Sequence, residues 1–271
     1  MKTGINVDFI AGKVGMEKAA KYVADAGFKY VDYTPPLKED NWEAIMKEHL
    51  KIIEANGLIV HQTHTPFNRY GSYGDKHTLY IERCMEATAY MGAEFTAVHG
   101  DEFDFENMEF SEEAALNYNH NYFAPYVEQS GKMGFKMAFE TVFEENSRGR
   151  RRYTSNPEEL LKLILSFESE NAVCCWDFGH ANVQFPKTAP EWIEKFGSLI
   201  KCTHLHDNAG NDSHQMPTTG DIKWQDTMNA LKKAGYNGVM SIEYAHGNVP
   251  EIYLPEFLKL TNKITEYLWN L

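Results

Sequence analysis

The sequence lacks long apolar runs. No stretch approaches the ~20 consecutive apolar residues that a membrane-spanning helix requires. The first fifteen residues, MKTGINVDFIAGKVG, also lack the apolar core of a secretory signal peptide. These two absences predict a cytoplasmic protein with no membrane partner.

Cysteine is scarce, with four residues among 271. Their spacing does not match a zinc finger, and two of them, Cys174 and Cys175, are adjacent within an apolar run. This pattern argues against a disulfide scaffold and a thiolate zinc site, and it indicates buried thiols in a reducing compartment.

Positive charge is also limited: 26 Lys and Arg residues face 39 Asp and Glu residues, for a net charge of −13. This balance disfavours a mainly electrostatic hold on nucleic acid, so we expect no nucleic-acid partner. No linker rich in Pro, Gly or Ser divides the chain. The length allows one large domain or two small ones, and without such a linker we expect one domain spanning residues 1–271.

The chain alternates short apolar runs with longer helical patterns. The predicted strands cover residues 4–10, 28–33, 58–62, 94–98, 135–139, 172–176, 199–206 and 239–242. Strands that alternate with helices form parallel sheets, and eight such units fit a closed (β/α)₈ barrel. An open, doubly wound sheet is the competing architecture.

Polar side chains distinguish these two architectures, because one lies at or just beyond the carboxyl end of six different strands. These residues are His64, His99, Glu140, Asp177, His206 and Glu243. The strand ends of a barrel converge on one mouth, whereas the outer strands of an open sheet lie too far apart to share a site. We therefore predict the α/β class with a single (β/α)₈ TIM barrel.

Four of these residues, Glu140, Asp177, His206 and Glu243, follow the four consecutive strands at the end of the chain. Three carboxylates and one imidazole suit Mn²⁺, Mg²⁺, Co²⁺ or Zn²⁺ better than a thiolate-preferring ion. Each carboxylate alone could instead cap a helix or pair with a basic residue. Their equivalent positions on neighbouring strands favour a metal site.

The stretch 201–224 adds further candidate ligands. His204 and His206 are two residues apart on a predicted strand and should face the same side. Asp212 and His214 follow in a polar loop, where they could orient a substrate or hold further metal ions. An imidazole that is hydrogen-bonded without a metal is the simpler alternative for any one histidine.

Three further features could serve a substrate. His180 follows Asp177 by three residues and could contact substrate or a second ion. Four of the six arginines lie in RGRRR at 148–152, so Arg148 and its neighbours could bind a phosphate or carboxylate, or form a solvated loop. Phe67 and Trp176 could line the mouth and stack on a sugar, although packing is the usual role of such aromatic residues.

Several motifs together resemble the sugar isomerase/epimerase superfamily of xylose-isomerase-like barrels, which includes ketose 3-epimerases, hydroxypyruvate isomerase and endonuclease IV. The motifs are MAFET at 137–141, DFGHAN at 177–182, HLHD at 204–207, DSHQMPTTGDIKW at 212–224 and SIEY at 241–244. The resemblance covers most of the chain in matching order. It is specific for the superfamily but not for one reaction.

The resemblance to ketose 3-epimerases implies one divalent ion, Mn²⁺ before Mg²⁺, Co²⁺ or Zn²⁺, on the four strand-end residues that include His206. The pattern of endonuclease IV would select His204 instead. The resemblance also implies proton transfer by Glu140 and Glu243, with His180 touching the substrate. The expected substrate-binding residues are His64, His99, His204, His214, Trp176, Phe67 and Arg148.

The implied function is a metal-dependent isomerase or epimerase of a sugar, sugar phosphate or keto-acid, acting through an enediolate. Loss of a β-hydroxyl from the same enediolate would make a dehydratase. A three-zinc phosphodiesterase for abasic DNA is the other enzyme reading, and a barrel without catalytic activity is the third. Ketose 3-epimerases carry an Arg where Asp212 stands here. The resemblance also suggests a homodimer or homotetramer.

Overall fold

The structure is a computed structural model that describes all residues except 67–75, 106, 145–151 and 245–248. Eight parallel strands form one sheet in the order β7-β6-β5-β4-β3-β2-β1-β8. The strands are β1 (Lys2–Asn6), β2 (Tyr30–Tyr33), β3 (Ile59–His64), β4 (Phe95–Val98), β5 (Lys136–Glu140), β6 (Ala172–Asp177), β7 (Ile200–His204) and β8 (Val239–Ile242).

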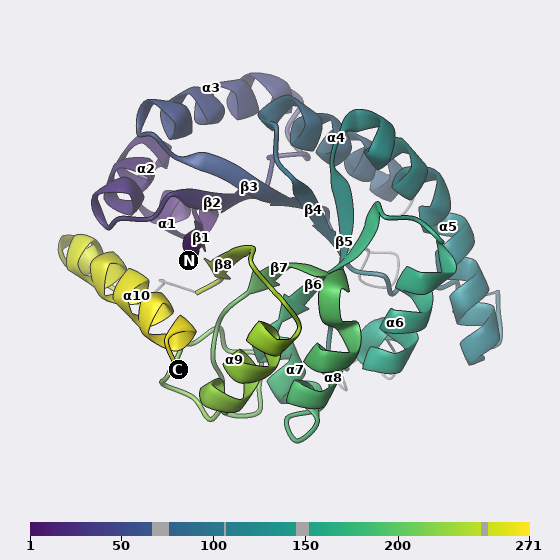
Figure 1. Cartoon of the computed structure of the whole chain (residues 1–271). Helices are drawn as coiled ribbons and strands as arrows, with labels where there is room; N and C mark the ends of the chain where they lie inside the picture. Colours follow the sequence, from purple (N-terminus) through teal and green to yellow (C-terminus); the bar gives the residue numbers. More distant parts are fainter. Residues whose placement is uncertain (67–75, 106, 145–151, 245–248) are drawn as a thin grey trace.

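Helices surround the strands on the outside of the sheet (Figure 1). The α-helices are α1 (Asp8–Val14), α2 (Met16–Asp25), α3 (Trp42–Ala55), α4 (Lys76–Met91), α5 (Glu112–Met133), α6 (Pro157–Ser166), α7 (Phe178–Gln184), α8 (Ala189–Phe196), α9 (Trp224–Lys233) and α10 (Leu254–Trp269). Short 3₁₀ helices are η2 (Tyr153–Ser155), η3 (Gly197–Leu199) and η4 (Glu251–Tyr253). None of the helices in these described ranges is long and apolar enough to cross a membrane.

The sheet closes on itself. At one seam β1 pairs in parallel with β8, from Lys2 opposite Val239 onward. At the other seam, the N–H of Leu205 donates to the carbonyl of Ser241 at 2.7 Å, and the N–H of Glu243 donates to the carbonyl of Leu205 at 3.0 Å. These bonds join the end of β7 to β8 and confirm the predicted (β/α)₈ barrel.

Strand alternation separates two apolar layers. Phe95 and smaller side chains from β4 to β7 form an inner cluster that includes Ala97, Ala138 and Cys175. Their neighbours point outward and pack beneath the helices in a much larger cluster. All four cysteines are free and buried, as the sequence predicts.

Trp176 belongs to the outer layer, so the prediction that it lines the mouth is wrong. It is fully buried, with its ring 5.7 Å from Phe196 and 6.0 Å from Phe185. Asp177, the next residue on β6, faces the barrel axis, and side chains alternate along a strand. Trp176 therefore packs against the helices.

Candidate metal centre

The carboxyl ends of β5, β6, β7 and β8 bring four side chains together at the mouth of the barrel. Oxygen and nitrogen atoms of Glu140, Asp177, His204 and Glu243 all lie within 4.8 Å of one another. We call these four residues the central group. The first three are buried, and Glu243 is 16% exposed.

The imidazole of His204 points into the carboxylates of this group. Its Nδ1 lies 3.3 Å from Glu140 Oε1, 3.4 Å from Glu243 Oε2 and 3.7 Å from Asp177 Oδ2. This buried nitrogen makes no hydrogen bond. Three carboxylates that converge on one ring nitrogen, at ion-pair rather than hydrogen-bond geometry, are the donor set that a divalent cation would satisfy. The central group therefore fits a metal ion.

The strand-seven member of the group is His204, whereas the sequence analysis placed His206 there. The set of ligand atoms within 4.8 Å of one another includes His204 in place of His206, and the choice between the two as the strand-seven ligand stays a prediction. The Nε2 of His206 lies 3.1 Å from Asp177 Oδ2, so His206 contacts the central group through Asp177.

A second set of ligand-type residues adjoins the central group through Glu140. We call His64, His99 and Glu140 the His99 group, and their ligand atoms again lie within 4.8 Å of one another. The Nε2 of His64 is 3.0 Å from Glu140 Oε2, and the Nε2 of His99 is 3.4 Å from the same oxygen. Glu140, with 1% exposure, is shared by both sets.

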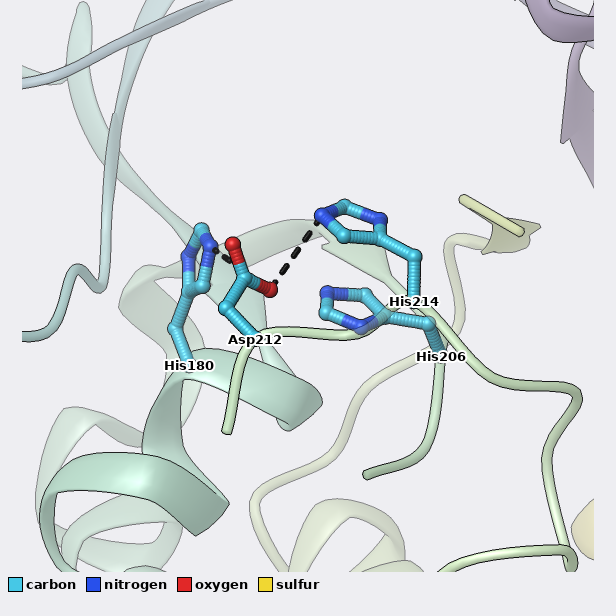
Figure 2. A group of neighbouring side chains, drawn as sticks. All are labelled: His180, His206, Asp212 and His214. Atoms are coloured by element: carbon cyan, nitrogen blue, oxygen red, sulfur yellow. Dashed lines mark ion pairs between the residues drawn. The ribbon is translucent and has the colours of Figure 1, made fainter. Parts of the chain in front are cut away.

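A third set adjoins the central group through Asp177, which His206 and His180 contact at 3.1 and 3.5 Å. The His214 group comprises His180, His206, Asp212 and His214 (Figure 2). The carboxylate of Asp212 reaches between two rings, with Oδ1 at 3.2 Å from Nε2 of His214 and 3.8 Å from Nε2 of His180 (Figure 2). The rings of His206 and His214 stack with centroids 3.9 Å apart.

Local structure fixes the position of each ring in the His214 group. Asp177 caps α7 by accepting a hydrogen bond from the N–H of His180 at 2.6 Å, so the strand end and the helix start hold both side chains. His214 has a φ of 42°, in the left-handed region that costs a residue with a Cβ of order 1 kcal/mol or more. Its surroundings hold it in this conformation.

Asp207 organises the loop that carries Asp212 and His214, and the sequence analysis did not single it out. Its carboxylate accepts hydrogen bonds from the indole N–H of Trp224 at 2.8 Å and from the backbone N–H of Thr218 at 2.9 Å. Its backbone pairs with Gln215 through two bonds of 2.8 Å. The motif HLHD, in which Asp207 follows His206, was the available signal.

Burial and charge act together on these groups. Burial opposes ionisation of Glu140, but the neighbouring His204 outweighs it and holds the pKa of Glu140 well below its usual range. Burial likewise opposes the charge of His204, but Glu243 and Glu140 raise the pKa of His204 well above its usual range. Protons on histidine thus balance the carboxylates, and a metal ion would have to displace them.

The same competition operates in the His214 group. Burial opposes the charge of His214, but the hydrogen bond with Asp212 and the charge of Glu243 raise the pKa of His214 to about 9. Burial also opposes ionisation of Asp212, yet its bonds to His180 and His214 lower the pKa of Asp212. The carboxylate is therefore ionised at neutral pH.

A cavity of about 530 Å³ opens beside the central group. This volume lies within the usual range of small-molecule sites, roughly 300–1,000 Å³. Its walls come mainly from the ends of β1, β2 and β3 and include Asn6, Asp8, Phe9, Thr34, Lys38, His64, Tyr80 and Glu243. Two metal-type residues, His64 and Glu243, thus face the space where a substrate could sit. The predicted substrate contacts Phe67 and Arg148 lie outside the described residues.

A model of the family described as xylose isomerase-like TIM barrel matches residues 20–262. The chain belongs to this family. The match covers most of the barrel, including the central group, the His99 group and the His214 group. It confirms the resemblance predicted from the motifs.

Individual relatives resemble the chain more loosely. MJ1311, an uncharacterized protein of Methanocaldococcus jannaschii, is 32% identical over 155 residues, which are 55% of this chain and 51% of MJ1311. The chain therefore aligns with about half the length of this relative.

Solved structures match over nearly the whole length. A D-tagatose 3-epimerase-like protein has a TM-score of 0.79 and 23% identity, covering 100% of this chain and 98% of its own. The D-psicose 3-epimerase of Clostridium cellulolyticum H10, solved with D-tagatose, has a TM-score of 0.77 and 14% identity, covering 99% of each chain. At these identities the likeness establishes the fold alone.

Proposed function

We propose that this protein is a divalent-metal-dependent epimerase or isomerase acting on a small polyhydroxylated carbonyl compound of the ketose type. The observation that carries the proposal is the central group, whose member Glu243 forms part of the cavity wall. The family match and the fold shared with ketose 3-epimerases support the same class of substrate.

Glu140, Asp177, His204 and Glu243 would hold the ion. Their mixture of carboxylate and imidazole suits Mn²⁺, with Mg²⁺, Co²⁺ and Zn²⁺ as alternatives. When bound, the ion would act as a Lewis acid on the substrate carbonyl and make the adjacent C–H more acidic.

The protein groups would move the proton. Glu243 reaches the cavity, so we assign it the removal of the proton α to the carbonyl. Glu140 is assigned the return of a proton, which it would first take from protonated His64, whose Nε2 lies 3.0 Å from Glu140 Oε2. That proton would go to the opposite face of the substrate in epimerisation or to the neighbouring carbon in isomerisation. His180, 3.2 Å from Glu140 Oε1, is assigned a substrate contact. Loss of a β-hydroxyl from the same intermediate, a dehydration, uses the same groups.

The cavity wall suits a sugar. Asn6, Asp8, Thr34 and Lys38 offer polar groups, and Phe9 offers an aromatic face that is 39% exposed. Burial raises the pKa of Asp8 to about 7, so near neutral pH this carboxyl can donate or accept a hydrogen bond from a hydroxyl group. A polar and aromatic wall is typical of carbohydrate sites.

The test is solvent deuterium exchange. The manganese-loaded protein is incubated in deuterated water with a panel of ketoses, sugar phosphates and keto-acids, and deuterium α to the carbonyl is measured by NMR. We expect exchange with at least one ketose-type compound, and a loss of about 10²-fold or more in Glu243→Gln. Glu251→Gln is the matched control, because Glu251 is exposed and pairs with Lys18. Exchange that survives in Glu243→Gln would contradict the assignment.

A second function is favoured by one observation, the His214 group next to the central group. Two adjacent metal ions are typical of phosphatases and nucleases, in which they hold the attacking and leaving oxygens. This arrangement supports phosphoester hydrolysis, including cleavage at abasic DNA sites. Hydrolysis of a sugar phosphate or an abasic duplex, with no deuterium exchange in any compound, would replace the epimerase proposal with this one.

A further inference from the structure

The histidines around the carboxylates differ in the group that contacts Nδ1 of the ring. Three of them place Nδ1 against a backbone carbonyl oxygen: His64 against Thr65 at 2.6 Å, His180 against Thr141 at 2.9 Å and His214 against Glu243 at 2.9 Å. A carbonyl oxygen only accepts, so each ring donates from Nδ1. In its neutral form each ring then carries a lone pair on Nε2, which is the usual state of a metal-ligating histidine.

His99 has the opposite arrangement. Its Nδ1 lies 2.9 Å from Nη2 of Arg152. A guanidinium group has only donors, so Nδ1 of His99 must be the acceptor. The proton of the ring is then on Nε2, which faces Glu140 Oε2 at 3.4 Å. A metal on Nε2 would require the ring to give up its last proton.

Arg152 is held firmly in this position. Its Nε donates to Asp101 Oδ2 at 2.5 Å, and its Nη1 donates to the carbonyl of Phe143 at 3.2 Å. Its backbone N–H donates to the carboxylate of Glu144 at 3.0 Å. The side chain is 9% exposed. Turning it away from His99 would therefore break a buried ion pair, which is costly.

We infer that Arg152 excludes a metal ion from the His99 group and makes His99 a hydrogen-bond donor to Glu140. Arg152 and His99 are positioning residues that orient the carboxylate shared with the central group. The residues of the three groups then hold at most two ions, in the central group and the His214 group. The inference about His99 rests on its own contacts, and only the ion count depends on the proposed function.

Nitrogen-15 NMR of the whole metal-free chain tests the protonation of His99 directly. We expect a proton on Nε2 and none on Nδ1, and we expect zinc to leave that proton in place. Over the same titration, His180 and His214 should lose their Nε2 protons. A proton on Nδ1 of His99, or loss of its Nε2 proton on addition of zinc, would overturn the inference.

A substitution tests the exclusion of metal. Arg152→Met frees Nδ1 of His99, so zinc content should rise by one ion per chain relative to the wild type. Arg83→Met is the matched control, because Arg83 donates to the Leu37 carbonyl and its loss should leave the zinc content unchanged. Arg152→Lys, which keeps a positive donor, should keep the wild-type content and covers the case in which Arg152→Met does not fold.

The outcomes separate the two proposals. Three zinc ions in the wild type, or an unchanged content in folded Arg152→Met, would overturn the inference. A wild-type chain that binds no zinc, while His99 keeps its Nε2 proton, would support the assignment of His99 and count against the proposed function.

Discussion

The His99 group and the His214 group both adjoin the central group and differ in the atoms that contact Nδ1 of their histidines. Both combine histidine with a carboxylate. Backbone carbonyls hold His180 and His214 with Nε2 turned to Asp212, whereas a guanidinium group holds His99. The comparison teaches that ligand types in the right places do not make a metal site. The residues that hydrogen-bond to the histidine rings decide which ring nitrogen can bind a metal ion.

The largest expected effect comes from Asp207, which supports the loop of the His214 group. In Asp207→Asn the amide loses acceptor capacity toward Trp224 and the loop backbone, which we expect to cost about 3 kcal/mol of unfolding free energy. Denaturant unfolding measures this, and Asp226→Asn on the exposed face of α9 is the control. A loss below about 1 kcal/mol would show that the loop holds itself without Asp207.

Two substitutions contrast the groups directly. Asp212→Asn removes a charged ligand, so zinc affinity at the His214 group should fall by about 100-fold or more. His99→Gln removes a ring that we assign as a donor, so the zinc content should not change. Titration with a zinc-sensitive dye measures both. A loss of one zinc ion per chain in His99→Gln would show that His99 binds zinc and would contradict the difference between the two groups.

Gly179 affects the His214 group because it lies directly against the ring of His206. A Cβ at Gly179 would lie 2.2 Å from Cε1 of His206, so Gly179→Ala must displace the ring that stacks on His214. We expect a loss of about 1–3 kcal/mol in unfolding free energy and weaker zinc binding. Gly12→Ala is the matched control: no atom lies within 4 Å of its added Cβ, and this variant should be neutral or slightly more stable.

The smallest effects concern pH, and the two groups should respond in opposite directions. The pKa of His214 is raised to about 9, so its contribution to the stability of the metal-free protein is complete below about pH 6.5 and is lost as pH rises to about 9. Burial lowers the pKa of His99, helped by the charge of Arg152, so its contribution is complete above about pH 6.5 and is lost as pH falls.

Unfolding of the metal-free protein across this pH range, in His214→Gln and His99→Gln, measures both contributions. His214→Gln should remove part of the stability loss on the alkaline side. His99→Gln should remove part of the loss on the acid side. The same sign of change in both variants would contradict the difference between the two rings.

The barrel could be predicted from the sequence because its signals are periodic and local. The strand expected at 239–242 agrees with β8 to the residue, and the strand expected at 172–176 differs from β6 by one residue. Two short helices were missed. The sequence predicted a strand over 4–10, but the strand ends at Asn6 and α1 begins at Asp8. Helix α7 directly follows Asp177, and its seven residues give too short a pattern to recognise.

Only those site residues that lie at the ends of strands could be predicted from the sequence. Glu140, Asp177 and Glu243 come together because barrel strands converge. The choice between His204 and His206 could not be made, since alternation places both on one face and the end of β7 is not visible in the sequence. The contact between Arg152 and His99 joins residues 53 positions apart, and no local pattern encodes it.

Zinc-edge anomalous diffraction from a crystal of the zinc-loaded protein tests the central claim most directly, because it locates each ion. The account predicts anomalous peaks among Glu140, Asp177, His204 and Glu243 and beside Asp212. It predicts no peak between His64 and His99, with Arg152 still bonded to the His99 ring. A peak between His64 and His99 in the wild-type protein would contradict it.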